Sequence, residues 1–336
     1  MAGQPPDAER AVRLLSVVAP ACNEEHSLEE FHRRLVSSIP DVDFELVVVD
    51  DGSTDGTAEV LDRLEGEDPR VRPIFLSRNF GHQAALTAGL DHARGDVVVM
   101  IDADLQDPPE LIPRLLDGWR EGSDVVYAVR RTRRGDSRLK LSAARWFYRL
   151  FERLTAIDLG RNSGDFRLVG GPALEALRSM RERTRFLRGM SAWVGFTRTA
   201  VEYDRDPRYA GETKYTTRRM LRFSVDAITS FSHVPLQFAM LMGFVFSAFA
   251  FLAIPVAIGL KIAGEFVPGI TTVLLAVLLL GGIQLITVGI IGEYMGRVYE
   301  EVKGRPLYLV REREPSPGRE LGPDEQRAER ERAASR

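Results

Sequence analysis

The chain has 336 residues, a length that accommodates one large α/β domain with a smaller appendage. Its 45 Lys and Arg residues nearly balance 48 Asp and Glu residues, and the net charge of −3 argues against a nucleic-acid-binding protein. The single cysteine, Cys22, excludes an internal disulfide bond, which fits a reducing compartment. Residues 1–13 contain no apolar run typical of a signal peptide, so we expect a disordered, cytoplasmic N-terminus.

Residues 14–215 form one predicted domain in which apolar strands alternate with helices. The strands are LLSVVAPA, FELVVVD, DVVVMI and SDVVYAVR, and helical patterns cover residues 27–38, 57–65 and 83–93. Continuous apolar strands separated by helices predict an α/β fold whose mostly parallel sheet is covered on both faces. Ligands of such sheets bind beyond the carboxyl ends of the strands. We therefore expect the acidic residues at these ends to converge on one edge: Glu24, Asp50, Asp51, Asp102 and Asp104.

The segment after Arg130 is basic and amphipathic. Residues 131–140 predict a mobile loop. Residues 141–154 (LSAARWFYRLFERL) interleave aromatic side chains with arginines, which fits a helix in a membrane interface or a helix packed on the domain. Residues 216–233 predict a second, juxtamembrane helix of this kind.

Two long apolar segments follow, at residues 234–260 and 270–291. Each exceeds the roughly 20 residues that cross a bilayer core, so residues 234–292 predict a transmembrane hairpin of two helices. Basic residues flank the hairpin on both sides, and the positive-inside rule then predicts a multi-pass protein of the cell membrane with its domain and both termini in the cytoplasm. Residues 293–311 would be a cytoplasmic juxtamembrane segment, and the charged residues 312–336 a disordered tail.

Asp102 and Asp104 stand where the chain leaves a buried strand. Two carboxylates separated by one residue can share a divalent cation there, and oxygen ligands favour Mg²⁺ or Mn²⁺. Such a cation neutralises a leaving diphosphate as a Lewis acid.

Asp51, at the end of the second strand, can accept a hydrogen bond from the base or ribose of a nucleotide. The same stretch also fits a helix N-cap at Ser53 or Thr54, with Asp55 in the first turn. Likewise, Glu24 can hold a nucleotide, while Ser27 and the Glu three residues later fit a capping box.

Four motifs carry a family resemblance: PACNEE, VVVDDGSTDGT, DADLQDPPE and SGDFRL. In this order and spacing they resemble the family 2 inverting glycosyltransferases. The chain is most similar to the polyprenyl-phosphate branch, which includes dolichol-phosphate mannose synthases and bactoprenol-phosphate glucosyltransferases. The likeness extends from about residue 15 to residue 310 and includes the ending GEYMGRVYEEVKGRPLYLV. It implies a GT-A fold that binds a nucleotide-sugar and a divalent metal.

The resemblance also implies roles for individual residues. The metal would lie among Asp102, Asp104 and Gln106, and Arg138 with Ser142 would bind the acceptor phosphate, although a solvated basic loop fits these two equally. Cys22 departs from the family, which usually has an aromatic residue there, so we expect weaker stacking on the base, and the resemblance gives less support for the identity of the base. The nucleotide-sugar would be bound by Pro20, Glu24, Val49, Asp51, Asp102, Ala103, Arg130, Arg208 and Lys214.

Asp165 matches the family's proposed catalytic aspartate, acting together with Asp104. A phosphate monoester has a second pKa of about 6 and is already largely a nucleophilic anion at neutral pH, so two roles are open for Asp165: a base, or a residue that orients the acceptor or the sugar. A structural Asp at a turn after Gly164 is the alternative. We expect His82 to cap or pack a helix rather than act as a ligand, and Trp193 to pack, with a place in the lining of the sugar site as the alternative.

The predicted reaction is inverting transfer of a hexose, with UDP-glucose as the expected donor, to undecaprenyl phosphate at the cytoplasmic membrane face. A GDP-mannose-dependent enzyme and a processive polysaccharide synthase of the same fold are alternatives, although the Q-x-x-R-W motif of such synthases is missing from the sequence. A non-enzymatic membrane scaffold would not need acids at three strand ends. The expected partners are the donor, the lipid phosphate and the bilayer, with no nucleic acid; self-association as a homo-oligomer stays open.

Overall fold

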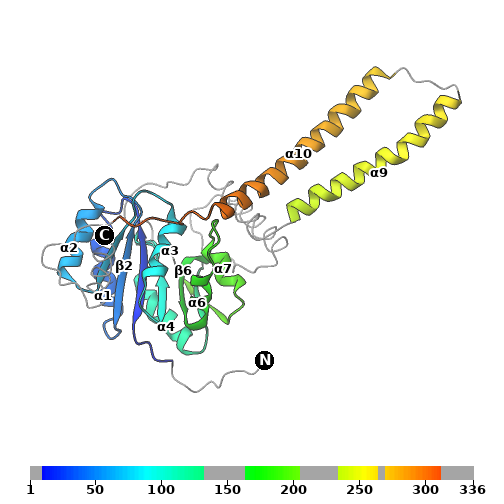
Figure 1. The fold of residues 1–336 in the computed structure, drawn as a ribbon. Coiled ribbons are helices and arrows are strands. Elements are labelled where there is room, and N and C mark those ends of the chain that lie inside the picture. Colours follow the sequence, from blue (N-terminus) through cyan, green and yellow to red (C-terminus); the bar gives the residue numbers. More distant parts are fainter. Residues whose placement is uncertain (1–9, 132–162, 205–233, 264–268, 312–336) are drawn as a thin grey trace, which may run out of the picture.

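The structure, a computed structural model, describes residues 10–131, 163–204, 234–263 and 269–311 as a sheet domain followed by two long helices (Figure 1). The elements of the sheet domain are β1 (Leu15–Ala21), α1 (Leu28–Ser38), β2 (Phe44–Asp50), α2 (Thr57–Glu67), β3 (Val71–Phe75), α3 (His82–His92), β4 (Val97–Met100), η1 (Pro109–Leu111), α4 (Ile112–Arg120), β5 (Val125–Arg130), β6 (Ser163–Gly170), α6 (Gly171–Ser179), α7 (Leu187–Trp193) and β7 (Arg198–Tyr203). The two long helices are α9 (Val234–Ile262) and α10 (Ile270–Lys303).

The strands of the described residues form one seven-stranded sheet in the order β3-β2-β1-β4-β6-β5-β7. Strands β3, β2, β1 and β4 are parallel to one another, and β5 is parallel to β7, whereas β6 runs antiparallel to both β4 and β5. The predicted α/β fold with a mostly parallel sheet is therefore confirmed. The strand pattern missed β3, β6 and β7, because each carries polar or charged residues that interrupt the apolar run.

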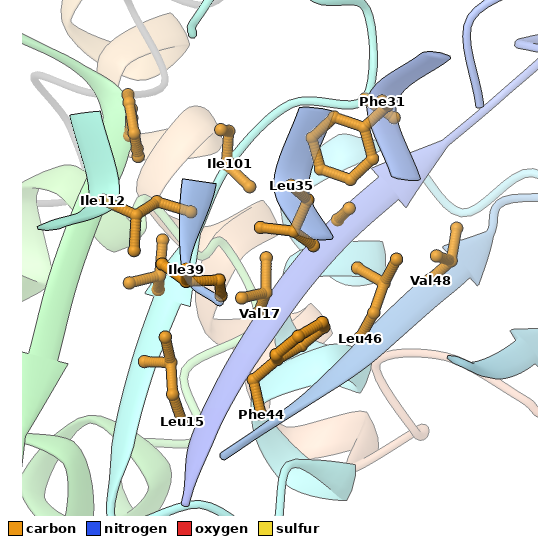
Figure 2. Close-up of a cluster of buried hydrophobic side chains, with 14 of the residues drawn as sticks. Leu15, Val17, Phe31, Leu35, Ile39, Phe44, Leu46, Val48, Ile101 and Ile112 are labelled. Atoms are coloured by element: carbon orange, nitrogen blue, oxygen red, sulfur yellow. The ribbon is translucent and has the colours of Figure 1, made fainter. Parts of the chain in front are cut away.

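Helices cover the sheet on both faces, as the continuous apolar strands predict. Successive residues of β2 alternate: Leu46 and Val48 face the core under α1, α2 and α4, while Val47 and Val49 face the core under α3, α6 and α7. Figure 2 shows the first of these cores, in which Phe31 and Leu35 of α1 pack against β1 and β2. Both side chains are completely buried, so truncating either to Ala would cost roughly 2–5 kcal/mol of folding free energy.

The two C-terminal helices extend away from the sheet domain as a hairpin (Figure 1). At 1.5 Å per residue, the 29 residues of α9 span roughly 43 Å. Large apolar side chains are exposed along both helices, among them Phe244 and Phe249 of α9 and Leu285 of α10. Within the described residues, one segment, Leu279–Lys303, is long and apolar enough to cross a membrane. The second predicted span stays a prediction.

Helix α10 continues past residue 292, where the sequence suggested the end of the hairpin, and stops at Lys303. Gly304 follows with φ 59°, in the left-handed conformation that commonly ends helices and that glycine adopts without strain. The chain then turns back onto the sheet domain, where Leu76 and Val310 form an antiparallel β-bridge beside β3. Helix α10 and the sheet domain are thus joined by a defined contact.

Candidate active site

Three parallel strands bring the predicted acidic residues to one edge of the sheet. Strands β2, β1 and β4 are adjacent and parallel, so the loops that follow them leave from the same edge. Glu24 follows β1, Asp51 follows β2 and Asp102 follows β4. The convergence expected from the sequence is therefore present.

Asp51 is tied to the loop that precedes α3. Its Oδ1 accepts a hydrogen bond from the amide of Phe80 at 2.7 Å, and its Oδ2 accepts one from the amide of Gly81 at 2.9 Å. Burial raises the pKa of Asp51, and the two amide hydrogen bonds oppose that rise. Gly52 has φ +67°, and a Cβ there would lie 2.6 Å from the backbone of Arg78, so only glycine lets the two loops approach this closely.

The helix starts next to the site differ from the predicted caps. Helix α2 begins at Thr57 with Gly56 at its N-cap; the Asp55 carboxylate accepts from the Thr57 amide at 3.1 Å, whereas the Ser53 hydroxyl donates to Asp50. The predicted N-cap at Ser53 or Thr54 is therefore wrong. Ser27 is the N-cap residue of α1, as expected, but the predicted capping box is wrong, because the Ser27 hydroxyl donates to Glu24 Oε2 at 2.7 Å. Short polar side chains offer several local bonding patterns, and the loop geometry selects among them.

The turn after β4 is held in an unusual conformation. Leu105 has φ 60°, rare for a non-glycine residue, and its side chain is buried in the core under α4. Asp104 Oδ1 accepts from the Gln106 amide at 3.1 Å, so the turn is closed on itself. The buried Leu105 side chain thus fixes the positions of Asp102 and Asp104 on either side of the buried Ala103.

Asp102 has the properties of a metal ligand. Its Oδ1 is buried with no hydrogen-bond partner among the described residues. Burial raises the pKa of Asp102 to about 6; His82 opposes this rise, and the carboxylates of Asp107 and Asp165 add to it. A carboxylate oxygen of this kind fits a divalent cation, which needs only one or two protein carboxylates when a diphosphate and water complete its shell. Within the described part of the chain, no group of three or more His, Cys, Asp or Glu side chains forms a complete protein-only metal site.

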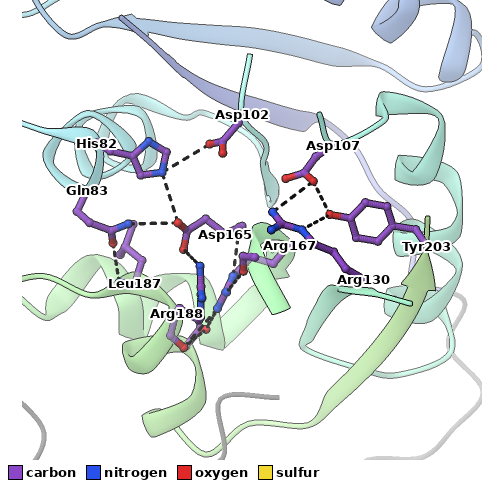
Figure 3. Close-up of polar contacts among 12 residues, drawn as sticks. His82, Gln83, Asp102, Asp107, Arg130, Asp165, Arg167, Leu187, Arg188 and Tyr203 are labelled. Atoms are coloured by element: carbon purple, nitrogen blue, oxygen red, sulfur yellow. Dashed lines mark hydrogen bonds and ion pairs between the residues drawn. The ribbon is translucent and has the colours of Figure 1, made fainter. Parts of the chain in front are cut away.

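His82 lies between two carboxylates (Figure 3). Its Nε2 is 3.5 Å from Asp102 Oδ1 and 3.4 Å from Asp165 Oδ2. Burial works against the charged imidazole, but the two carboxylates outweigh it and raise the pKa of His82 to about 9. His82 is the first residue of α3, yet its side chain points into the site, so the expected capping or packing role is wrong.

Asp165 lies inside β6 and is surrounded by cations and donors (Figure 3). Arg188 Nη2 of α7 is 3.5 Å from Asp165 Oδ1, and Gln83 Nε2 donates to Asp165 Oδ2 at 3.5 Å. Burial favours protonation, but Arg188 and His82 outweigh it and hold the pKa of Asp165 well below its usual range. A turn-capping role after Gly164 does not fit a residue inside a strand. The low pKa makes Asp165 a poor proton acceptor and favours an orienting role.

Two further residues hold this group in place. The buried Arg167 donates to the backbone oxygen of Gly164 at 2.7 Å and to the Ser191 hydroxyl, so it ties β6 to α7. The Gln83 Oε1 accepts from the Leu187 amide at 2.9 Å, which connects the start of α7 to α3. The polar side chains around Asp165 thus come from three separate elements.

Arg130, at the end of β5, is engaged by a buried acid. Its Nη2 is 3.6 Å from Asp107 Oδ1, its Nε donates to the Tyr203 hydroxyl at 3.1 Å, and that hydroxyl donates to Asp107 (Figure 3). Burial and the Asp107 carboxylate raise the pKa of Tyr203. Arg130 therefore braces the QDPP turn in this structure, and its predicted contact with a diphosphate stays a prediction.

The other predicted site residues fall into three groups. Pro20 and Val49 are buried within strands, and the Val49 side chain packs in the core under α3, so only its backbone could face a nucleoside. Gln106 is half-buried beside Asp104. The predicted site residues that lie outside the described residues are Arg138, Ser142, Arg208 and Lys214.

Sequence reasoning missed Gln83, Asp107, Arg188 and Tyr203 and misassigned Trp193. Trp193 ends α7 and is 64% exposed, so the expected packing role is wrong. Among the missed residues, only Asp107 lies in a quoted motif, DADLQDPPE. The others had no local signal, because their roles depend on contacts with residues far away in the sequence.

The fold and the candidate site are typical of α/β enzymes, which bind their ligands at the carboxyl edge of the sheet. The family model described as "Glycosyl transferase family 2" matches residues 16–176. The uncharacterized glycosyltransferase YkcC of Bacillus subtilis is 46% identical over 298 residues, covering 88% of this chain and 92% of YkcC. The prophage bactoprenol glucosyl transferase homolog of Escherichia coli is 40% identical over 300 residues, covering 88% of this chain and 98% of that protein. The chain therefore belongs to glycosyl transferase family 2 and is a glycosyltransferase.

Among solved structures, the chain is similar to glucosyl-3-phosphoglycerate synthase from Mycobacterium tuberculosis in complex with Mn²⁺, uridine-diphosphate-glucose and phosphoglyceric acid. The TM-score is 0.45 at 25% sequence identity, over 64% of this chain and 77% of that one.

Proposed function

We propose that the protein transfers glucose from UDP-glucose to a polyprenyl phosphate, with inversion, at the cytoplasmic face of the cell membrane. The observation that carries this proposal is the buried Asp102 Oδ1 at the carboxyl edge of the sheet, which has no hydrogen-bond partner among the described residues and, together with Asp165, contacts His82. The choice of glucose and of a bactoprenol acceptor is supported by the name of the Escherichia coli relative, which this chain matches over nearly its full length.

The donor would lie along the edge formed by the loops after β1, β2 and β4. Asp51 keeps lone pairs free beyond its two amide contacts, so it can accept a further hydrogen bond from a base or ribose. A divalent cation, Mg²⁺ or Mn²⁺, would be held by Asp102 and Asp104 with Gln106 and would offset the negative charge of the leaving diphosphate.

The reaction itself needs little from a protein base. An oxygen of the lipid phosphate attacks the anomeric carbon from the face opposite the diphosphate; the new carbon–oxygen bond forms as the bond to the diphosphate breaks. A phosphate monoester is largely ionised at neutral pH, so no proton has to be removed. Asp165, whose pKa lies well below the usual range, would therefore orient the sugar or the acceptor.

The exposed apolar helices support a membrane location. A polyprenyl chain stays in the bilayer while its phosphate reaches the enzyme, and α10 carries a segment long enough to span. In this proposal α9 is the second span, and the sheet domain and both termini are cytoplasmic.

A panel of radiolabelled nucleotide-sugars with undecaprenyl phosphate, read by lipid extraction, tests the proposal. UDP-glucose should give a labelled lipid only when enzyme, acceptor and divalent cation are all present, and the product should have the opposite anomeric configuration to the donor. A labelled lipid obtained only with GDP-mannose would favour a mannose synthase. A polymeric product would favour a processive synthase. No lipid label from any donor would refute the proposal.

A further inference from the structure

The segment after α10 lies across the sheet domain; we call residues 305–311 the C-terminal strap. Its backbone pairs with the end of β3: the Ser77 amide donates to the Leu309 oxygen at 2.8 Å, and the Arg311 amide donates to the Phe75 oxygen at 2.7 Å. The Tyr308 hydroxyl donates to Asp91 Oδ2 of α3 at 2.9 Å, and its ring packs against the core under α3. The strap is therefore a docked part of the fold.

The end of α10 is joined to the loop that precedes α7. The Arg183 amide donates to Glu301 Oε1 at 2.6 Å, Arg183 Nε lies 3.7 Å from Glu300 Oε2, and its guanidinium donates to the backbone oxygen of Arg305. The same loop leads to Arg188, which pairs with Asp165. Helix α10 and the strap are thus connected to the site through a short stretch of chain.

A pocket of about 510 Å³ lies between the strap and the site. Its lining includes Asp165 and His82 of the site and, from the strap, Leu307. Leu307 is half-buried there, while Leu309, two residues further along, is 53% exposed and does not line the pocket. The strap therefore contributes one apolar side chain to a wall of the pocket next to Asp165.

The lining combines positive charge with apolar surface. Arg183, Arg185 and Arg188 outnumber the single carboxylate, Asp165, and the Nε atoms of Arg185 and Arg188 are buried without a hydrogen-bond partner in the described structure. Phe80 and Leu307 supply the apolar part. Such a lining fits an anion with an apolar group attached directly to it, and the strap connects this pocket to a helix with an exposed apolar surface.

We propose that this pocket holds the first isoprenoid unit of the lipid phosphate and that Leu307 and Phe80 contact it. This assignment rests on the proposed function, because it names the subsite for that acceptor. Leu307 is then a residue that determines acceptor affinity, and Tyr308 and Arg183 are positioning residues that hold it against the pocket. The phosphate itself lies nearer to Asp165, within reach of the sugar.

Steady-state kinetics with L307W and the matched control L309W test the assignment. A bulky indole at position 307 should fill part of the pocket, so KM for the polyprenyl phosphate should rise about tenfold or more, while KM for UDP-glucose stays within about twofold. L309W, on the exposed side chain of the same strap, should leave both values unchanged. An unchanged acceptor KM in L307W, or an equal rise in both KM values, overturns the assignment.

A fluorescence experiment tests the subsite without requiring transfer. Cys22 is the only cysteine, so a bimane label can be placed on L307C or on L309C in a C22S background. Titration with farnesyl phosphate should shift the emission of the label at position 307 to shorter wavelength and leave that at position 309 unchanged. If wild-type enzyme transfers glucose but the label at position 307 does not respond, the subsite is wrong and the proposed function stands. If no donor gives transfer but this label responds, the proposed function is wrong and the subsite stands.

Discussion

His82 and Asp165 face each other across the site, with Nε2 of the imidazole 3.4 Å from Oδ2 of the carboxylate. One belongs to the first turn of α3 and the other to β6, and 82 residues lie between them in the sequence. The imidazole also lies 3.5 Å from Asp102. The positively charged imidazole of His82 favours the ionised form of both carboxylates, so removing its charge should change the rate of transfer.

Replacing His82 with Gln should lower the rate of transfer by on the order of 10²-fold, because the two carboxylates lose the charge between them. His82→Lys should restore part of the rate, since it returns a cation to the same position. Single-turnover transfer from UDP-glucose measures both variants, and UDP binding by calorimetry provides the control for intact folding. If His82→Gln transferred the sugar at the wild-type rate, the charge of the imidazole would not contribute to transfer.

Asp104→Ala should abolish measurable transfer and weaken the cation-dependent binding of UDP, because the turn after β4 loses one of its two carboxylates. The matched control is Asp117→Ala, which removes an exposed acid of α4 that pairs only weakly with Arg120 on the surface. Calorimetric titration with UDP, with and without Mg²⁺, measures the loss of cation-dependent binding separately from the loss of transfer. Full activity of Asp104→Ala in the presence of a chelator would refute a role for the cation.

Glu45 should make the fold sensitive to acid. Its buried carboxylate accepts hydrogen bonds from the Ser16 hydroxyl and the Arg94 amide and pairs with Arg72. Burial acts to raise its pKa, but these contacts outweigh burial and lower the pKa below the ordinary 4.5. Because the folded pKa is lower than the unfolded one, this stabilisation is complete above about pH 4.5 and is lost as the pH falls through the folded value.

Glu45→Gln should cost about 3 kcal/mol of unfolding free energy at pH 7, since Arg72 loses its buried partner. Its stability should then depend less on pH below 4.5 than that of the wild type. Urea unfolding at pH 7 and pH 4, followed by tryptophan fluorescence, measures this, with the exposed Glu175→Gln as control. Parallel pH curves for Glu45→Gln and wild type would contradict the prediction.

Tyr308→Phe should loosen the C-terminal strap without removing its apolar packing, because only the hydrogen bond to Asp91 is lost. We expect amide hydrogen exchange at residues 305–311 to become about fivefold faster, equivalent to about 1 kcal/mol. The acceptor KM should rise while the donor KM stays constant. Tyr299→Phe, on the exposed surface of α10, is the control. Unchanged exchange in the strap would show that Tyr308 does not anchor it.

Much of the fold and part of the site could be predicted from local sequence. The apolar runs of β1, β2 and β4 identified a sheet buried on both faces, because such strands need cover on both sides. Parallel neighbours then bring Asp51 and Asp102 to one edge. The capping box at Ser27 and the N-cap at Ser53 or Thr54 were wrong, since short polar side chains have several bonding options that only the final loop geometry separates.

By itself, the sequence determined the α/β class, the shared edge of the acidic loops and the family, because strand burial and short motifs are local properties of the chain. Only the tertiary structure decided that His82 lies between Asp102 and Asp165, that Arg188 pairs with Asp165 and that the C-terminal strap brings Leu307 to the pocket. Each of these contacts joins elements far apart in the sequence. Which residues meet in these contacts depends on how the helices and strands pack, and a local sequence pattern does not predict that packing.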